Sequence, residues 1–161
     1  MEISLVDESV MRSRWDDVED ALRRAFAGSH FNDEGYTVDN PINYTRSVVE
    51  GRLGPGFKHL LALDDAGSVI GGFFCIQTEL KGSTTAHDIG WIFAVPEIDR
   101  PMRREMIDTF MQRAFATLRE AGFRRIESNM GTRAGGASLS RHYGFVHSPV
   151  PGNDNRWVKE L

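Results

Sequence analysis

Four segments of the chain have the residue pattern of helices. Residues 15–26 and 101–122 repeat apolar positions every three or four residues, which places these positions on one face of each helix. The apolar positions are Trp15, Val18, Leu22 and Phe26 in the first segment, and Met102, Met106, Ile107, Phe110, Ala114 and Leu118 in the second. Segment 41–53 opens on a proline and segment 134–143 is followed by a glycine, so we expect shorter helices there.

Strands are expected where β-branched and aromatic residues gather between turns. These segments are 3–6, 57–63, 69–80, 84–95, 124–130, 145–147 and 156–158. Segment 84–95 is apolar on both faces near its end, which indicates a buried, central strand. The order strand, long helix, strand over 84–130 predicts a βαβ crossover. The pattern therefore predicts one α/β (α+β) domain over 1–161, with a central mixed sheet of about six to seven strands and about four helices.

Composition narrows the class of protein. The chain has 161 residues, of which 40% are hydrophobic and 26% charged, as in an ordinary globular domain. Its single cysteine, Cys75, excludes an internal disulfide, and its five histidines lack metal-ligand spacing, so no metal site is expected. The acidic start lacks the pattern of a signal peptide, and no apolar run is long enough to cross a membrane. We expect a cytoplasmic protein without a membrane partner.

Charge is divided unevenly along the chain. Residues 1–99 contain 8 basic and 17 acidic residues, a net charge of −9, and residues 100–161 contain 11 and 6, a net charge of +5. Such a division is typical of an anionic ligand on one half and a cationic ligand on the other, or of solvated faces alone. The overall charge of −4, with acidic residues among the arginines, argues against nucleic-acid binding.

Two segments resemble a known family. Asp-Ile-Gly-Trp-Ile-Phe-Ala-Val-Pro-Glu at 88–97 is similar to the fourth strand of the GNAT superfamily of acyl-CoA-dependent N-acyltransferases. Segment 135–145, which ends in Gly-Phe, is similar to the family's last helix. The order and spacing of the predicted elements match as well. The resemblance implies a sheet whose central strands splay apart, with acyl-CoA, and acetyl-CoA above all, in the gap.

The resemblance also implies a donor site. The main chain of Phe93, Ala94 and Val95 would bond the pantetheine arm, and a backbone N–H near Ala94 would meet the oxyanion. The pyrophosphate would lie at the start of the following helix. Segment 99–106 departs from the family there, because the usual loop glycines are missing. The residues expected to face the phosphates instead are Arg100, Met102, Arg103 and Arg104.

The same resemblance implies the catalytic groups. Asp88 aligns with an acidic base on the fourth strand, where burial would raise its pKa. Its neighbour His87 points to the opposite face of a regular strand, so it is an alternative to Asp88 and not its partner. The family's proton-donating tyrosine aligns with Ser140, and Tyr143 lies three residues on, near the same helix face, where it can substitute.

The acceptor is expected on the other wall. Aromatic residues there would shape an apolar pocket, and acidic residues would attract a cationic amine. The aromatic residues are Phe31, Tyr36 and Phe73, and the acidic ones are Asp33, Glu34 and Glu79. The predicted reaction is direct transfer of an acyl group to a primary amine of a small molecule. Two alternatives stay open: a carrier-protein thioester as donor, or a non-catalytic ligand-binding module. The resemblance also admits a homodimer formed through a sheet edge.

Overall fold

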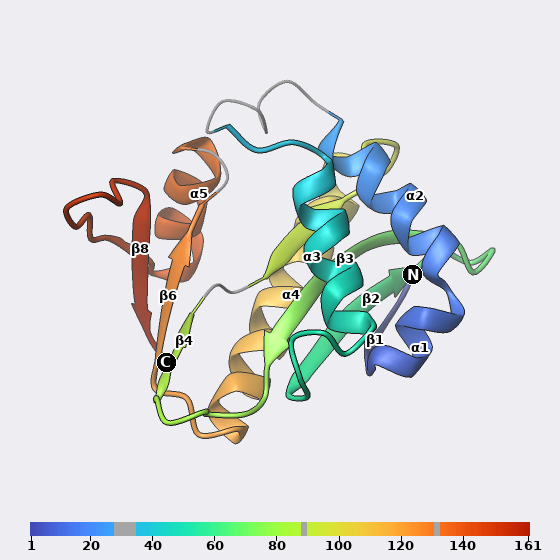
Figure 1. Ribbon diagram of the computed structural model, residues 1–161. Helices are drawn as coiled ribbons and strands as arrows, with labels where there is room; N and C mark the ends of the chain where they lie inside the picture. The colour runs from blue at the N-terminus through green and yellow to red at the C-terminus, as the bar shows by residue number, and fades with distance from the viewer. Residues whose placement is uncertain (28–34, 88–89, 131–132) are drawn as a thin grey trace.

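The computed structural model describes residues 1–27, 35–87, 90–130 and 133–161. In these ranges the elements follow the order β-α-α-α-β-β-β-β-α-β-α-β-β (Figure 1). The helices are α1 (Glu8–Ser13), α2 (Trp15–Phe26), α3 (Asp39–Val49), α4 (Arg100–Glu120) and α5 (Arg133–Tyr143). The strands are β1 (Glu2–Val6), β2 (Phe57–Leu63), β3 (Val69–Gln77), β4 (Thr85–His87), β5 (Trp91–Ala94), β6 (Arg125–Asn129), β7 (Val146–His147) and β8 (Arg156–Glu160).

The described strands form two four-stranded sheets where we expected a single one. The first has the order β1-β2-β3-β5 and is antiparallel throughout. The second has the order β4-β6-β8-β7, and its β4–β6 pair is parallel. The expected mixed arrangement is confirmed, and so is the parallel pair on either side of the long helix. The expected splay of the central strands appears as the division between the two sheets.

That division has a local cause in the segment expected as one strand, 84–95. The chain pairs with β6 through β4, then crosses to the first sheet and pairs with β3 through β5 (Figure 1). Gly90, just before β5, has φ +78°, and a Cβ built on it would lie 1.7 Å from the carbonyl oxygen of Phe74. Only glycine fits such an approach. The alternation of apolar residues cannot show this break, because it continues on both sides of it.

Different helices cover the two faces of the first sheet, with α1, α2 and α3 on one side and α4 on the other (Figure 1). This explains why eight of the nine residues of β3 are buried. The apolar stripes of α2 and α4 point into the core as predicted at Val18, Leu22, Met106 and Phe110, which are fully buried. Met102, the first predicted position of the α4 stripe, is exposed instead. Burial of these side chains supplies the main stabilisation of the fold.

Helix starts differ from the prediction in two places. Residues Glu8–Ser13 form α1, a short helix that was not predicted, and it is capped by Asp7, whose carboxylate accepts from the amide of Ser9 at 2.9 Å. Helix α3 begins at Asp39, two residues before the predicted start, and the side chain of Asn40 accepts from the Thr37 amide at 2.6 Å. None of the helices in the described ranges is long and apolar enough to span a membrane.

Candidate active site

A cavity of about 440 Å³ opens where the two sheets part. Its walls are β5, the first two turns of α4, the end of β6 and the inner face of α5. Four of the residues expected at the site line this cavity, namely Arg100, Arg103, Arg104 and Tyr143. The end of β6 contributes Ser128, Asn129 and Met130, which the sequence did not single out. The polar Ser128 and Asn129 at the end of the predicted strand 124–130 were the available signal.

The backbone of β5 has one hydrogen-bonding edge that no described strand covers, because β5 is the last strand of its sheet. The amide of Val95 donates to the carbonyl oxygen of Ile70 on β3 at 3.0 Å. In an antiparallel ladder every second residue directs both its N–H and its C=O toward the neighbouring strand. Phe93, two residues before Val95, therefore also directs its N–H and C=O toward β3. The N–H and C=O of Ile92 and Ala94 therefore point to the open edge. Of the three residues expected to bond pantetheine, only Ala94 offers its main chain there.

The start of α4 has few backbone amides left for an anion. The side chain of Asp99 accepts from the amide of Met102 at 2.8 Å, and its carbonyl accepts from the amide of Arg103 at 2.9 Å. Pro101 has no N–H to offer. The Asp99 carboxylate also places negative charge where a phosphate would otherwise benefit from the helix dipole. The side chain of Met102 is 39% exposed and lies outside the cavity lining.

Three arginine side chains bring positive charge to the cavity wall instead. Arg103 donates to the carbonyl oxygens of Pro96 and Ile98 at 3.2 and 3.4 Å, and so ties the preceding loop to the helix. Arg104 forms an ion pair with Asp108 at 2.9 Å. Arg100 makes no hydrogen bond or ion pair with any described residue. This charge can meet an anionic ligand through side chains alone.

Tyr143 presents its hydroxyl to the same wall and donates it to the carboxylate of Asp108. Burial, and then this hydrogen bond, raise the pKa of Tyr143, so the phenol stays protonated at neutral pH. Burial alone would raise the pKa of Asp108, but hydrogen bonds from Tyr143 and Arg104 outweigh it and the pKa is lowered. Ser140 lies on the same helix but does not line the cavity.

His142 completes this group of side chains. Its ring nitrogens lie 3.2 and 3.4 Å from the guanidinium of Arg104, and its ring borders the cavity. Neither Asp108 nor His142 was predicted from the sequence. The four-residue spacing of Arg104 and Asp108 was a usable signal for their ion pair. Nothing in the sequence shows that Tyr143 would reach Asp108 from another helix.

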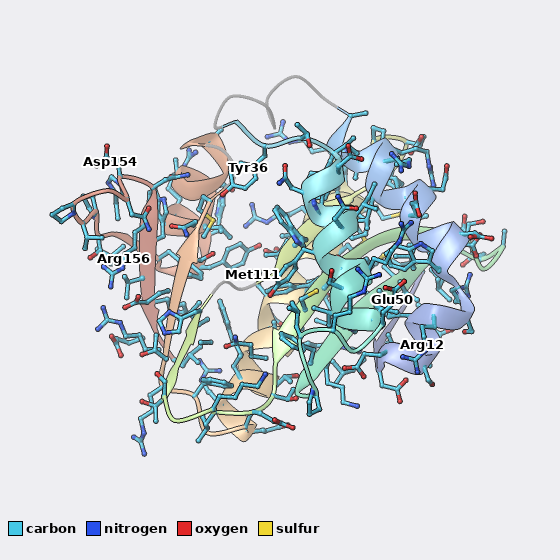
Figure 2. All side chains as sticks on the ribbon, viewed as in Figure 1. Arg12, Tyr36, Glu50, Met111, Asp154 and Arg156 are labelled. Carbon is cyan, nitrogen blue, oxygen red and sulfur yellow. The ribbon has the colours of Figure 1, made fainter. Side chains whose placement is uncertain are left out.

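An aromatic group lies at the β5 side of the cavity, where Phe26 and Trp91 belong to its lining. The ring of Trp91 lies 6.0 Å from that of Phe26 and 6.1 Å from that of Tyr36, both edge to face. Figure 2 shows Tyr36 in the space between α3 and α5. Two residues expected to contact the acceptor lie elsewhere: Phe73 is buried in the core, and Glu79 is exposed beyond the end of β3.

Four expected site residues lie outside the described ranges. They are the proposed base Asp88 and the acceptor-side residues Phe31, Asp33 and Glu34.

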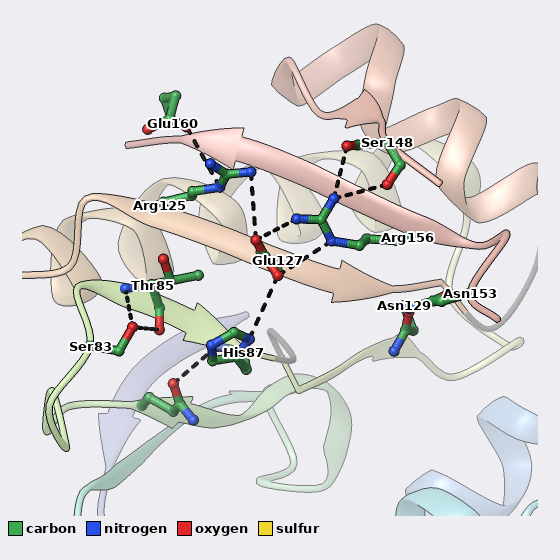
Figure 3. A network of polar contacts seen from close by, with 11 residues as sticks. Ser83, Thr85, His87, Arg125, Glu127, Asn129, Ser148, Asn153, Arg156 and Glu160 are labelled. Atoms are coloured by element: carbon green, nitrogen blue, oxygen red, sulfur yellow. Dashed lines mark hydrogen bonds and ion pairs between the residues drawn. The ribbon is translucent and has the colours of Figure 1, made fainter. Parts of the chain in front are cut away.

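His87, the alternative to Asp88, belongs to a polar network on the second sheet (Figure 3). Its Nδ1 lies 3.8 Å from the carboxylate of Glu127, which also receives hydrogen bonds from Arg156. The bond from Arg156 is the main reason that the pKa of Glu127 is lowered. Glu127 is thus a stable anion, held on β6 next to the cavity-lining residues Ser128 and Asn129.

Comparison with known proteins identifies the fold. No family model and no curated protein matches the chain. Solved structures do match. A GNAT family N-acetyltransferase from Escherichia coli in complex with CoA (YhbS) has a TM-score of 0.66 at 17% identity, over 99% of this chain and 80% of that one. The PaiA N-acetyltransferase from Thermoplasma acidophilum, in complex with coenzyme A, has a TM-score of 0.61 at 15% identity, with both chains covered completely.

The crystal structure of Tetrahymena GCN5 gives a TM-score of 0.61 at 12% identity, over 100% of this chain and 96% of that one. The chain therefore has the fold of the GNAT acetyltransferases. The resemblance seen in segments 88–97 and 135–145 is confirmed at the level of the fold.

Proposed function

We propose that the protein is a GNAT-family N-acyltransferase that transfers an acetyl group from acetyl-CoA to a primary amine of a small molecule. The observation that carries this proposal is the open edge of β5 beside a cavity with three arginines on its wall. An extended amide chain such as pantetheine can bond to a strand edge as a further strand would. The structures with this fold include two that are complexes with CoA.

In this proposal the donor lies along β5. The N–H and C=O of Ala94 bond the pantetheine arm, and the side chains of Arg100, Arg103 and Arg104 meet the phosphates. The arginines replace the backbone amides, because Asp99 and Pro101 leave few of these open at the start of α4. When the donor binds, the guanidinium of Arg104 contacts a phosphate and gives up part of its ion pair with Asp108.

The chemistry follows from these positions. The neutral amine attacks the thioester carbonyl carbon, a C–N bond forms, and the oxyanion is met by a backbone N–H at the open edge. Asp88 accepts the proton that the nitrogen loses. The C–S bond breaks, and the thiolate takes a proton from Tyr143, which regains one from solvent. We assign this last role to Tyr143 and not to Ser140 because only Tyr143 lines the cavity.

The small number of free backbone amides at the start of α4 favours a second candidate, in which the donor is a pantetheine thioester on a carrier protein. Such a donor has no pyrophosphate to place there. Calorimetry with acetyl-CoA and with S-acetylpantetheine separates the two candidates. We expect acetyl-CoA to bind at least 10-fold more tightly, through its phosphates. Equal affinity would favour the carrier-bound donor. Binding without turnover of any amine would point to the non-catalytic module.

A further inference from the structure

His59 is a fully buried histidine in the middle of the first sheet and does not belong to the cavity lining. Its Nδ1 accepts a hydrogen bond from the backbone amide of Cys75 on the neighbouring strand at 3.1 Å. Accepting at Nδ1 requires the neutral tautomer with its proton on Nε2. Nε2 itself has no partner among the described residues. Buried polar groups are normally hydrogen-bonded, so a buried imidazole with one unpaired nitrogen calls for a structural explanation.

The reason lies in the pairing of β2 with β3. Lys58 pairs with Ile76 and Leu60 pairs with Phe73, so His59 alone faces two residues, Phe74 and Cys75. This is a β-bulge, which leaves a backbone amide out of the strand ladder. The imidazole of His59 satisfies that amide. Cys75 has φ +66°, a conformation that side chains other than glycine seldom adopt.

A second contact holds the bulge from the other side. The thiol of Cys75 lies 4.0 Å from the hydroxyl of Thr45 on α3, and both side chains are buried. Burial raises the pKa of the Cys75 thiol to about 12, so the thiol stays protonated and acts as a packed group. The strained residue is therefore clamped between β2 and α3.

The bulge lies where the two sheets separate. Phe74 is the last residue of β3 that pairs with β5. The carbonyl oxygens of Phe74 and Cys75 would lie 1.7 and 3.3 Å from a Cβ on Gly90. The bulged backbone therefore lies directly against Gly90, the residue before β5. The opposite edge of β5 is the one that no described strand covers.

We propose that His59 is a positioning residue, whose neutral imidazole holds the β3 bulge and thereby the strand break that opens β5 to the acyl donor. The expected effect of His59 on donor binding rests on the proposed function. The expected effect of His59 on the backbone does not. His59 touches neither the donor nor the cavity and acts through Cys75 and Gly90.

The test compares three variants. His59→Asn places an amide oxygen near the position of Nδ1, and His59→Leu removes the acceptor at similar volume. Leu61→Ala, two residues along β2, lowers stability without touching the bulge. We expect the affinity for acetyl-CoA to fall at least 10-fold in His59→Leu and less than 3-fold in the other two. Hydrogen exchange at the amides of Trp91 and Phe93 should be accelerated in His59→Leu alone.

Unchanged affinity and unchanged exchange in folded His59→Leu would overturn the inference. If wild-type protein binds no acetyl-CoA, the proposed function fails, and the exchange rates still decide the role of His59. If His59→Leu does not fold, ¹⁵N NMR of the wild-type protein tests the inference through the tautomer of the His59 imidazole. The inference requires His59 to carry its proton on Nε2 and the Cys75 amide to be protected. An Nδ1–H tautomer, or rapid exchange at Cys75, would contradict it.

Discussion

The hydroxyl of Tyr143 on α5 donates a hydrogen bond to the carboxylate of Asp108 on α4, across the cavity wall. Asp108 is also paired with Arg104, so one carboxylate orients both the proposed proton donor and a proposed phosphate-binding side chain. The two halves of the proposed donor site are thereby coupled through a residue that is not itself part of the cavity lining.

Tyr143→Phe tests the proton-donor role. We expect kcat to fall by about 10²-fold, the lower end of the range for general acid catalysis, because Asp108 and burial make the phenol a weak acid. The KM for acetyl-CoA should change less than 3-fold. Steady-state kinetics measure both quantities, and Ser140→Ala is the matched control on the same helix. An unchanged kcat in Tyr143→Phe would remove this residue from the mechanism.

Asp88→Asn tests the proposed base. The amide cannot accept the amine proton, so kcat should fall by about 10²-fold or more while calorimetry shows unchanged acetyl-CoA affinity. His87→Asn serves as the comparison, because His87 is the alternative base. A loss of turnover in His87→Asn with full activity in Asp88→Asn would move the role to the histidine beside Glu127.

Arg100→Ala tests whether side chains hold the donor phosphates. Removal of one charge-assisted contact should weaken acetyl-CoA binding by about 10-fold and leave S-acetylpantetheine binding unchanged. Arg119→Ala, near the far end of α4, changes the net charge equally and should have no effect. Titrations at two salt concentrations add a check, since the wild-type affinity should be the more salt-dependent one. Equal losses for both ligands would contradict the assignment.

Gly90→Ala tests the strand break. The methyl group would lie 1.7 Å from the carbonyl of Phe74, so we expect a loss of more than about 3 kcal/mol in the free energy of unfolding. Gly82→Ala has a similar φ of +84° with nothing within 4 Å, and should lose only about 1 kcal/mol. Urea unfolding measures the difference. Similar losses at both positions would show that the close approach to Phe74 does not constrain the fold.

The buried His59 predicts a pH dependence of stability. Burial first, and the charge of Lys58 second, lower its pKa from 6.5 to about 4, with Asp7 opposing. Between these values the unfolded chain binds a proton that the folded chain does not, so stability falls as pH falls, by up to about 3 kcal/mol. Unfolding curves of His59→Asn should lack this component. A variant with the same pH dependence as wild type would contradict the prediction.

The features of the fold that depend on hydrophobic periodicity were predictable from the sequence. The stripes containing Leu22 and Phe110 are buried as expected, and the crossover between β4 and β6 is parallel. The break at Gly90 was not predictable, because apolar alternation carries no information on a backbone that leaves one sheet for another. The pairing of Asp108 with Tyr143 joins two helices and has no local signature. The amide of Cys75, a residue with positive φ, is bonded by an imidazole from another strand, a contact that also has no local signature.

Calorimetric titration of the protein with acetyl-CoA tests the central claim most directly, because the proposed reaction requires the open edge of β5 and the arginines beside it to bind that donor. We predict saturable binding at one site per chain with a dissociation constant in the micromolar range, weakened by Arg100→Ala and unaffected by Arg119→Ala. An absence of binding up to millimolar acetyl-CoA would contradict the account.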